Sequence, residues 1–188
     1  MRKIAVIFPG VGYNKDKPLL YYSGKLAVKR GYELIHLDFS GLDWSKEKLK
    51  DRAFLLESVE TCFKKADAAL ERLGDISADE IVFISKSIGT VVANAYAKNK
   101  GLRAKQICFS PLEMIDEYVG AGDAVLFCGD GDPYAEYEKL VSIAKDKNLE
   151  MFTVHGGNHS LETGEIISDI ENIKNIMIRV NEILTGEE

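Results

Sequence analysis

Short apolar runs alternate with longer amphipathic stretches along most of the chain. The short runs, rich in β-branched and aromatic residues, predict buried strands at 3–8, 33–39, 81–85, 105–109, 124–128 and 149–154. The amphipathic stretches predict helices at 19–31, 45–73, 88–101, 135–147 and 166–184. Strands that alternate with helices are typical of a parallel sheet covered on both faces. The pattern therefore predicts a doubly wound α/β fold with a mainly parallel, six-stranded sheet.

Two of the predicted helices carry especially regular apolar stripes. In the helix at 45–73 the stripe consists of Leu49, Ala53, Leu56, Val59, Phe63, Ala66, Leu70 and Leu73. In the last helix, apolar residues recur at 166, 170, 173, 177, 180 and 184. These steps of three and four place each stripe on one face of its helix. Because no repeat, low-complexity stretch or linker interrupts the pattern, we expect a single domain over residues 1–188.

Composition and charge narrow the class of protein. The 188 residues carry a net charge of −6, which argues against a nucleic-acid partner, since those proteins usually present a basic patch. No apolar run reaches the roughly 18 residues of a membrane span, and the first run is too short for a secretory signal. Cys62, Cys108 and Cys128 lie in apolar patterns without metal-site spacing, so we expect buried, reduced thiols. A cytoplasmic location follows as an expectation.

A serine occupies the junction between the third predicted strand and the helix after it. The junction reads Ser85-Lys86-Ser87-Ile88-Gly89, with a small residue two positions before and two positions after Ser87. Ligands of parallel sheets bind outside the carboxyl ends of the strands, where this segment lies. A serine on such a sharp turn is typical of a nucleophile elbow. The alternative is an ordinary turn with incidental serines, but the position favours Ser87 as a nucleophile.

A serine nucleophile needs a base to take its proton, and the chain has three histidines. His36 lies within the second predicted strand, where a packed strand residue is the simpler interpretation. His155 and His159 both follow the last strand, in HGGNHSLE. We favour His159 because it follows a Gly-Gly-Asn turn and could project back over the sheet, whereas His155 is still close to the strand end.

The imidazole needs a carboxylate to fix its tautomer and stabilise its cation. Asp130 and Asp132 follow the fifth strand, at the same predicted edge. Asp132 stands further out on its loop, and it is our candidate for the acid. Asp130 is our candidate for an Asp that only caps the next helix. The chain order Ser87, Asp132, His159 is that of the α/β-hydrolases.

Backbone N–H groups must stabilise the oxyanion that forms in such a reaction. The N–H of Ile88 directly follows the nucleophile at a helix N-terminus. The N–H of Val11, between two glycines in FPGVGYN, is the most plausible second donor. The same segment makes a weak dinucleotide-binding loop, since Pro9 lies in it and no third glycine follows at the needed spacing.

Five segments together, FPGVGYNKDKPLLYYSGKLA, ISKSIGT, FSPLE, GDGDPY and GGNHSLE, resemble a group of small, poorly characterised bacterial α/β-hydrolase-fold proteins. The resemblance spans almost the whole chain. It implies a serine hydrolase with a triad of Ser87, Asp132 and His159, in which Asp132 matches the acid of a Gly-x-x-Asp loop. Two strands that commonly open the fold are absent, and the segment between the strands at 105–109 and 124–128 is too short for a lid. The resemblance thus implies a minimal α/β-hydrolase fold without a lid domain.

The same loops offer candidate substrate contacts. Tyr13, Tyr22 and Tyr134 could line a small, partly polar site, or the tyrosines could pack the first helix against the sheet. Lys86 precedes the nucleophile, where the resembling proteins often have histidine. It could attract an anionic substrate, but we favour an ion pair with a loop carboxylate such as Asp16 or Asp130.

These observations favour a cofactor-independent serine hydrolase of a small ester or thioester. One alternative is a degenerate hydrolase fold that binds a ligand without turnover. A less favoured one is metal-assisted hydrolysis by Asp130, Asp132, His155 and His159, which would leave Ser87 unexplained. The sequence leaves the oligomeric state open.

Overall fold

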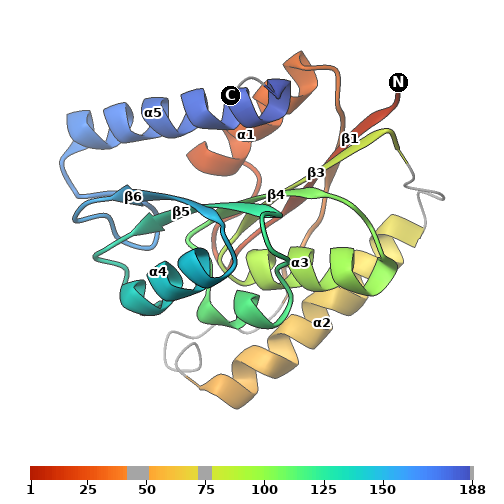
Figure 1. The fold of residues 1–188 in the computed structure, drawn as a ribbon, viewed down its shortest axis with the longest axis horizontal. Coiled ribbons are helices and arrows are strands. Elements are labelled where there is room, and N and C mark those ends of the chain that lie inside the picture. The colour runs from red at the N-terminus through yellow and green to blue at the C-terminus, as the bar shows by residue number, and fades with distance from the viewer. Residues whose placement is uncertain (42–50, 72–77, 187–188) are drawn as a thin grey trace.

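The computed structural model of the protein describes residues 1–41, 51–71 and 78–186. Its strands form one six-stranded parallel sheet in the order β2-β1-β3-β4-β5-β6 (Figure 1). The strands are β1 (Lys3–Phe8), β2 (Glu33–His36), β3 (Glu80–Lys86), β4 (Lys105–Phe109), β5 (Ala124–Gly129) and β6 (Glu150–Val154). The predicted six-stranded α/β architecture is therefore confirmed.

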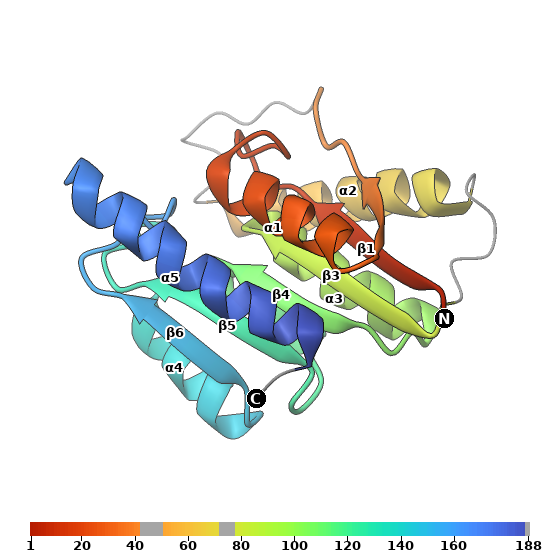
Figure 2. The same cartoon turned by 90° about the horizontal axis from the view of Figure 1, so that it is seen from above.

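Helices cover both faces of this sheet. They are α1 (Pro18–Lys29), α2 (Arg52–Glu71), α3 (Ile88–Lys100), α4 (Tyr137–Asp146) and α5 (Ile166–Thr185), with a short 3₁₀ helix, η2 (Glu113–Glu117), between β4 and β5. Figures 1 and 2 show α1 and α5 side by side on one face and α2, α3 and α4 on the other. The arrangement is the doubly wound one, in which every crossover leaves room for a covering layer.

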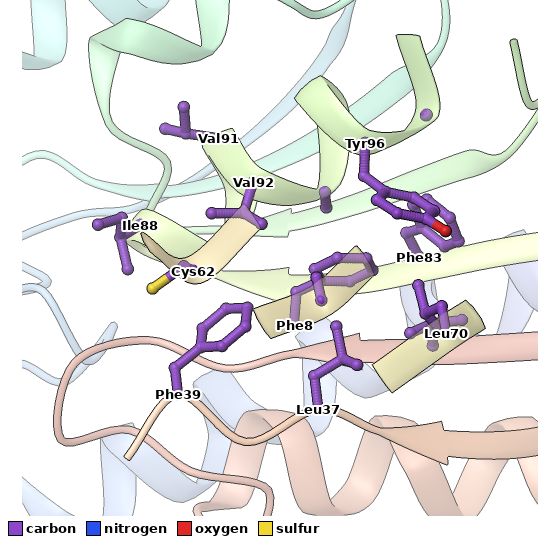
Figure 3. Packing of buried hydrophobic residues seen from close by; sticks show 14 of the residues in the cluster. Phe8, Leu37, Phe39, Cys62, Leu70, Phe83, Ile88, Val91, Val92 and Tyr96 are labelled. Carbon is purple, nitrogen blue, oxygen red and sulfur yellow. The ribbon is translucent and has the colours of Figure 1, made fainter. Parts of the chain in front are cut away.

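The core follows from strand alternation. Along β3, Phe83 faces α2 and α3, while Val82 and Ile84 face α1 and α5, and all three are fully buried. The ring of Phe8 on β1 packs against that of Phe83 with 4.9 Å between centroids (Figure 3). Because both faces of these strands are covered, they are apolar at nearly every position.

The second predicted strand is shorter in the structure. The strand predicted at 33–39 ends as β2 at His36, because the Asp38 carboxylate accepts hydrogen bonds from the N–H and hydroxyl of Ser40 and turns the chain. The helix predicted at 45–73 is described as α2 from Arg52 to Glu71. Asp51 is described and precedes the helix, and the remaining residues of that prediction, with Leu49 and Leu73, lie outside the described residues.

The apolar stripes only partly match the buried faces. In α2, Leu56 of the predicted stripe is 43% exposed, whereas Cys62, outside the stripe, is fully buried. In α5 the stripe is buried at Val180 and Leu184, but Ile166 is 72% exposed. The first turns of α5 extend beyond its contact with the sheet and α1, so their stripe residues pack against little (Figure 2).

The three cysteines are buried and unpaired, as expected. Within the described ranges, no helix is both long and apolar enough to cross a bilayer.

The strand order fixes where the loops meet. The chain passes from β1 outward to β2, and then returns to place β3 on the other side of β1. The loops after β1 and β3 therefore leave in opposite directions at one point of the sheet edge, which is where open α/β sheets bind ligands.

Candidate active site

Ser87 lies in the sharp turn between β3 and α3. It has φ 55° and ψ −125°, a backbone conformation that costs a non-glycine residue about 1–3 kcal/mol. Its N–H donates to the Phe109 carbonyl on β4 at 3.0 Å, which holds the turn in place. Ser87 occupies the N-cap position of α3, yet its side chain makes no capping hydrogen bond. The hydroxyl is therefore not held by the N–H groups of α3.

Two glycines let the neighbouring backbone close around this turn. A Cβ on Gly89 would collide with the main-chain oxygens of Phe8 and Pro9, so the first turn of α3 rests directly on the end of β1. A Cβ on Gly10 would lie 3.1 Å from the Ser87 Cβ, which places the β1–α1 loop against the serine itself.

His159 and Asp132 complete a hydrogen-bonded chain with Ser87. The His159 Nε2 lies 2.8 Å from the Ser87 Oγ, and the Nδ1 lies 2.6 Å from the Asp132 Oδ2. The Asp132 side chain is 4% exposed and that of His159 is 22% exposed. Since a carboxylate accepts from Nδ1–H, the Nε2 is free to accept the serine proton. Three loops, after β3, β5 and β6, thus bring together the three residues predicted for the triad.

The surroundings of His159 favour its neutral form. Burial lowers the pKa of His159, and the positive charge of Lys86 lowers this pKa further, while the hydrogen bond to Asp132 opposes both. The resulting pKa of His159 lies below the ordinary histidine value, so the imidazole stays available as a base.

A second Asp–His pair lies beside the first. The Asp130 carboxylate contacts the His155 Nδ1 at 2.9 Å and also accepts a hydrogen bond from the Gly156 N–H. The prediction that Asp130 caps α4 is therefore wrong, because its carboxylate ties the β5 loop to the β6 loop instead. Its partner His155 has a side chain that is 87% exposed.

The four side chains considered for metal binding thus form two separate pairs. Among the described residues, no three His, Cys, Asp or Glu side chains converge in a way that could hold an ion. The metal-assisted alternative therefore gains no support from the arrangement of these residues.

Lys86 does not lie where the sequence suggested. Its side chain is fully buried, and its Nζ donates a hydrogen bond to the main-chain oxygen of His159 at 2.6 Å. Asp16 instead contacts Lys15, and Asp130 contacts His155. The favoured ion pair was wrong because alternation along β3 directs Lys86 inward, beneath the loop that carries His159.

The predicted oxyanion donors lie on the two segments that flank Ser87. Ile88 begins α3, and the first N–H groups of a helix have no acceptor within the helix. Val11 lies in a tight turn closed by a hydrogen bond from the Gly10 N–H to the Tyr13 carbonyl at 3.1 Å. The close approach of Gly10 to Ser87 keeps this turn near the serine. The N–H groups of Ile88 and Val11 therefore remain predicted oxyanion donors, and their segments lie where such donors are needed.

A cavity of about 500 Å³ opens beside the β1–α1 loop. The residues that line it are Pro9, Gly10, Gly12, Tyr13, Asn14, Lys15, Asp16, His36, Leu37, Asp38, Phe39 and Ser40. A Cβ on Gly10 would lie 3.1 Å from the Ser87 Cβ, so the Gly10 wall of the cavity lies near the proposed nucleophile, although Ser87 and His159 themselves do not line the cavity. Partial burial and the nearby Lys15 charge lower the pKa of His36. His36 is the last residue of β2 and is exposed, so the prediction that it is a packed strand residue is wrong, and its place in this wall was not predicted.

The three candidate tyrosines lie in different places. Tyr13 lines the cavity, and its hydroxyl accepts a hydrogen bond from the Leu19 N–H. The Tyr134 ring stands edge-on to the His159 ring, 5.0 Å away. Tyr22 is 50% exposed on α1, contacts the Tyr21 ring and is absent from the cavity lining. The structure therefore does not bring Tyr22 to the site.

The chain matches no known protein-family model and no curated protein. Its fold is similar to many solved structures. A Xanthomonas campestris protein provisionally described as a hydrolase of the α/β superfamily is 14% identical, with a TM-score of 0.71, and the match covers 98% of this chain and 99% of that one. Est1E from Butyrivibrio proteoclasticus is 15% identical with a TM-score of 0.68, covering 99% of this chain and 88% of that chain.

A further Xanthomonas campestris protein, described as an α/β serine hydrolase without a lid, is 10% identical, with a TM-score of 0.59 and coverage of 94% of this chain and 81% of that chain. Identities this low establish the fold alone. The chain has the α/β-hydrolase fold in a minimal form, which confirms the class predicted from its sequence.

Proposed function

We propose that this protein is a serine hydrolase that cleaves a small acyl ester or thioester. The observation that carries the proposal is the hydrogen-bonded chain from Ser87 through His159 to Asp132, with 2.8 Å between the Ser87 Oγ and the His159 Nε2. Ser87, the first member of this hydrogen-bonded chain, lies in a strained turn at the end of a strand, which is the geometry a nucleophile elbow requires. The α/β-hydrolase fold of the neighbouring structures is consistent with this chemistry.

The reaction follows from these contacts in two balanced halves. The His159 Nε2 takes the Ser87 proton while the Oγ attacks the substrate carbonyl carbon, and the N–H groups of Ile88 and Val11 donate to the oxyanion. Asp132 stabilises the imidazolium. The intermediate then expels the alcohol or thiol, which takes its proton from His159, and an acyl ester of Ser87 remains. Water, activated by the same imidazole, releases the acid and restores the serine.

The cavity beside the β1–α1 loop supports a small, partly polar substrate. Its walls carry charged and polar side chains from Lys15, Asp16, His36 and Asp38. A long acyl chain would have to displace water from these groups without replacing their hydrogen bonds, which costs free energy. Short or polar acyl and leaving groups therefore fit best.

A fluorophosphonate probe tests the proposal directly. The wild type should be labelled, and Ser87→Ala and His159→Ala should not be. Labelling that persists in Ser87→Ala would overturn the assignment of the nucleophile. A wild type that is folded but not labelled would favour a hydrolase fold that binds without turnover.

A substrate panel then addresses specificity. It should contain short aliphatic esters, matching thioesters and hydroxycinnamoyl esters, the last because one structure of Est1E is described with bound ferulic acid. We expect kcat/KM to fall as the acyl chain lengthens, with no requirement for an added cofactor.

A further inference from the structure

Lys86 is a fully buried lysine, and burying its ammonium group costs free energy. It has no exposed surface, and an ammonium group taken out of water loses its hydration, a loss that only close partners can offset. In the part of the chain that the structure describes, no carboxylate lies within ion-pair distance of its Nζ. The Nζ has one hydrogen bond, to the His159 main-chain oxygen at 2.6 Å, and lies 5.1 Å from the centre of the Tyr13 ring.

The position of Lys86 in β3 explains how it reaches His159. Side chains alternate between the faces of a strand, so Lys86 shares the α1 and α5 face with Val82 and Ile84. The loop that carries His159 crosses this face on its way from β6 to α5. Lys86 therefore supports that loop from below, directly beside the nucleophile.

A second side chain converges on the same carbonyl. The Ser110 hydroxyl, at the end of β4, donates to the His159 oxygen at 3.0 Å. Ser110 is 1% exposed and has φ 42°, a conformation uncommon for a residue other than glycine. Two buried donors from neighbouring strands thus fix the main chain of the residue whose ring bridges Ser87 and Asp132.

The charge of Lys86 acts on the same imidazole. The titratable groups that face Lys86 are Tyr13 from the β1–α1 loop, Asp132 from the β5 loop and His159 itself, with Glu162 near Tyr13. Burial raises the pKa of Tyr13 to about 12, so its phenol is neutral. Burial lowers the pKa of Lys86 to about 7, and the charge of Asp132 opposes that shift. Lys86 therefore carries its charge at the acidic pH values where a histidine would otherwise be protonated.

We propose that Lys86 is a positioning residue of the triad, which holds the main chain of His159 by its hydrogen bond and keeps the imidazole neutral by its buried positive charge. The proposal rests on the function proposed above for Ser87 and His159. A residue that served packing alone would be replaced at lower cost by an apolar side chain of similar length, such as methionine.

Histidine titration by NMR tests whether the Lys86 charge lowers the pKa of His159, and it needs no enzymatic activity. Lys86→Met removes the charge and keeps the length of the side chain, and Lys86→Gln is a second neutral variant. The His159 resonance is identified by its loss in His159→Gln, and His36 and His155 serve as internal references. We expect the His159 pKa to be higher in both variants than in the wild type, with the two references unmoved. An unchanged or lower His159 pKa in a folded variant would overturn the proposal.

Labelling kinetics test the positioning half. The fluorophosphonate labelling rate at pH 7 should fall by about tenfold to 10²-fold in Lys86→Met, since small displacements of a catalytic base have effects of this size. Ser110→Ala should also lower the rate but leave the His159 pKa unchanged, because it removes a neutral donor. The matched control is Lys98→Met, which removes an exposed lysine that donates to the Glu117 carbonyl at 2.8 Å, and it should alter neither quantity.

The outcomes separate the two proposals. A wild-type labelling rate that Lys86→Met leaves unchanged would overturn the role of Lys86 while the serine hydrolase assignment stands. A folded wild type that is not labelled would contradict the serine hydrolase proposal, while the NMR titration would still report on the contact between Lys86 and His159.

Discussion

At the scale of single residues, the site selects between chemically equivalent groups. The loop after β5 carries two aspartates, Asp130 and Asp132, and the loop after β6 carries two histidines, His155 and His159. Only Asp132 and His159 connect to Ser87, because Asp130 and His155 form a separate pair on the outer side. Residue type alone could not distinguish the two pairs, and the hydrogen bonds do.

This selection predicts unequal effects of two matched substitutions. Asp132→Asn should lower the fluorophosphonate labelling rate by about 10⁴-fold, because an amide no longer holds the His159 tautomer that accepts the serine proton. Asp130→Asn changes the neighbouring aspartate in the same way and should leave the rate within about twofold of wild type. Equal losses in the two variants would contradict the assignment of the acid.

The environment of His159 also predicts a pH profile. Its pKa is lowered by burial and by the Lys86 charge, so the neutral imidazole persists below the ordinary histidine value of about 6.5. The acidic limb of labelling rate against pH should therefore have its midpoint below 6.5. A midpoint above that value would show that the Asp132 contribution outweighs burial.

At the scale of elements, the turn from β3 to α3 works because two segments of backbone approach closely. Gly89 is the position where the first turn of α3 meets the end of β1, and the strained Ser87 precedes it. The hydrogen bond from the Ser87 N–H to β4 holds the other side of the turn. The elbow is therefore a property of three adjacent strands rather than of its own five residues.

Gly89→Ala should destabilise this turn by about 1–3 kcal/mol and slow labelling, since the methyl group would displace α3 from the oxygens of Phe8 and Pro9. Urea denaturation gives the free energy of unfolding. Gly24→Ala is the control, because its methyl would meet only the ends of the Leu34 and Ile7 side chains, at 3.1 and 3.2 Å. It should cost less and leave the labelling rate unchanged.

At the scale of the whole molecule, the sheet order and the two helical layers bring the loops to one edge. The order β2-β1-β3-β4 places the β1–α1 loop and the elbow next to each other, and β4 supports both the elbow and the His159 loop. An apolar layer packs the sheet against helices α2 and α3 (Figure 3).

Phe83→Ala should lower the free energy of unfolding by about 3–5 kcal/mol, since Phe83 is fully buried in that layer. The measurement is the urea midpoint at an unchanged slope. Tyr21→Ala removes an aromatic ring that is 43% exposed and should shift the midpoint far less. Similar shifts in the two variants would mean that the layer contributes less to stability than its burial indicates.

The sequence by itself determined the six strands, the covering helices and three residues of suitable chemistry after three strand ends, because alternation and helical periodicity are local properties of the chain. It could not determine the partner of Lys86, the role of Asp130, the distance of Tyr22 from the site or the cavity wall at His36. Those depend on which face of a strand meets which loop, and loops far apart in sequence meet only when the sheet is assembled. The tertiary structure decided them by bringing the ends of β1, β3, β4, β5 and β6 to one edge.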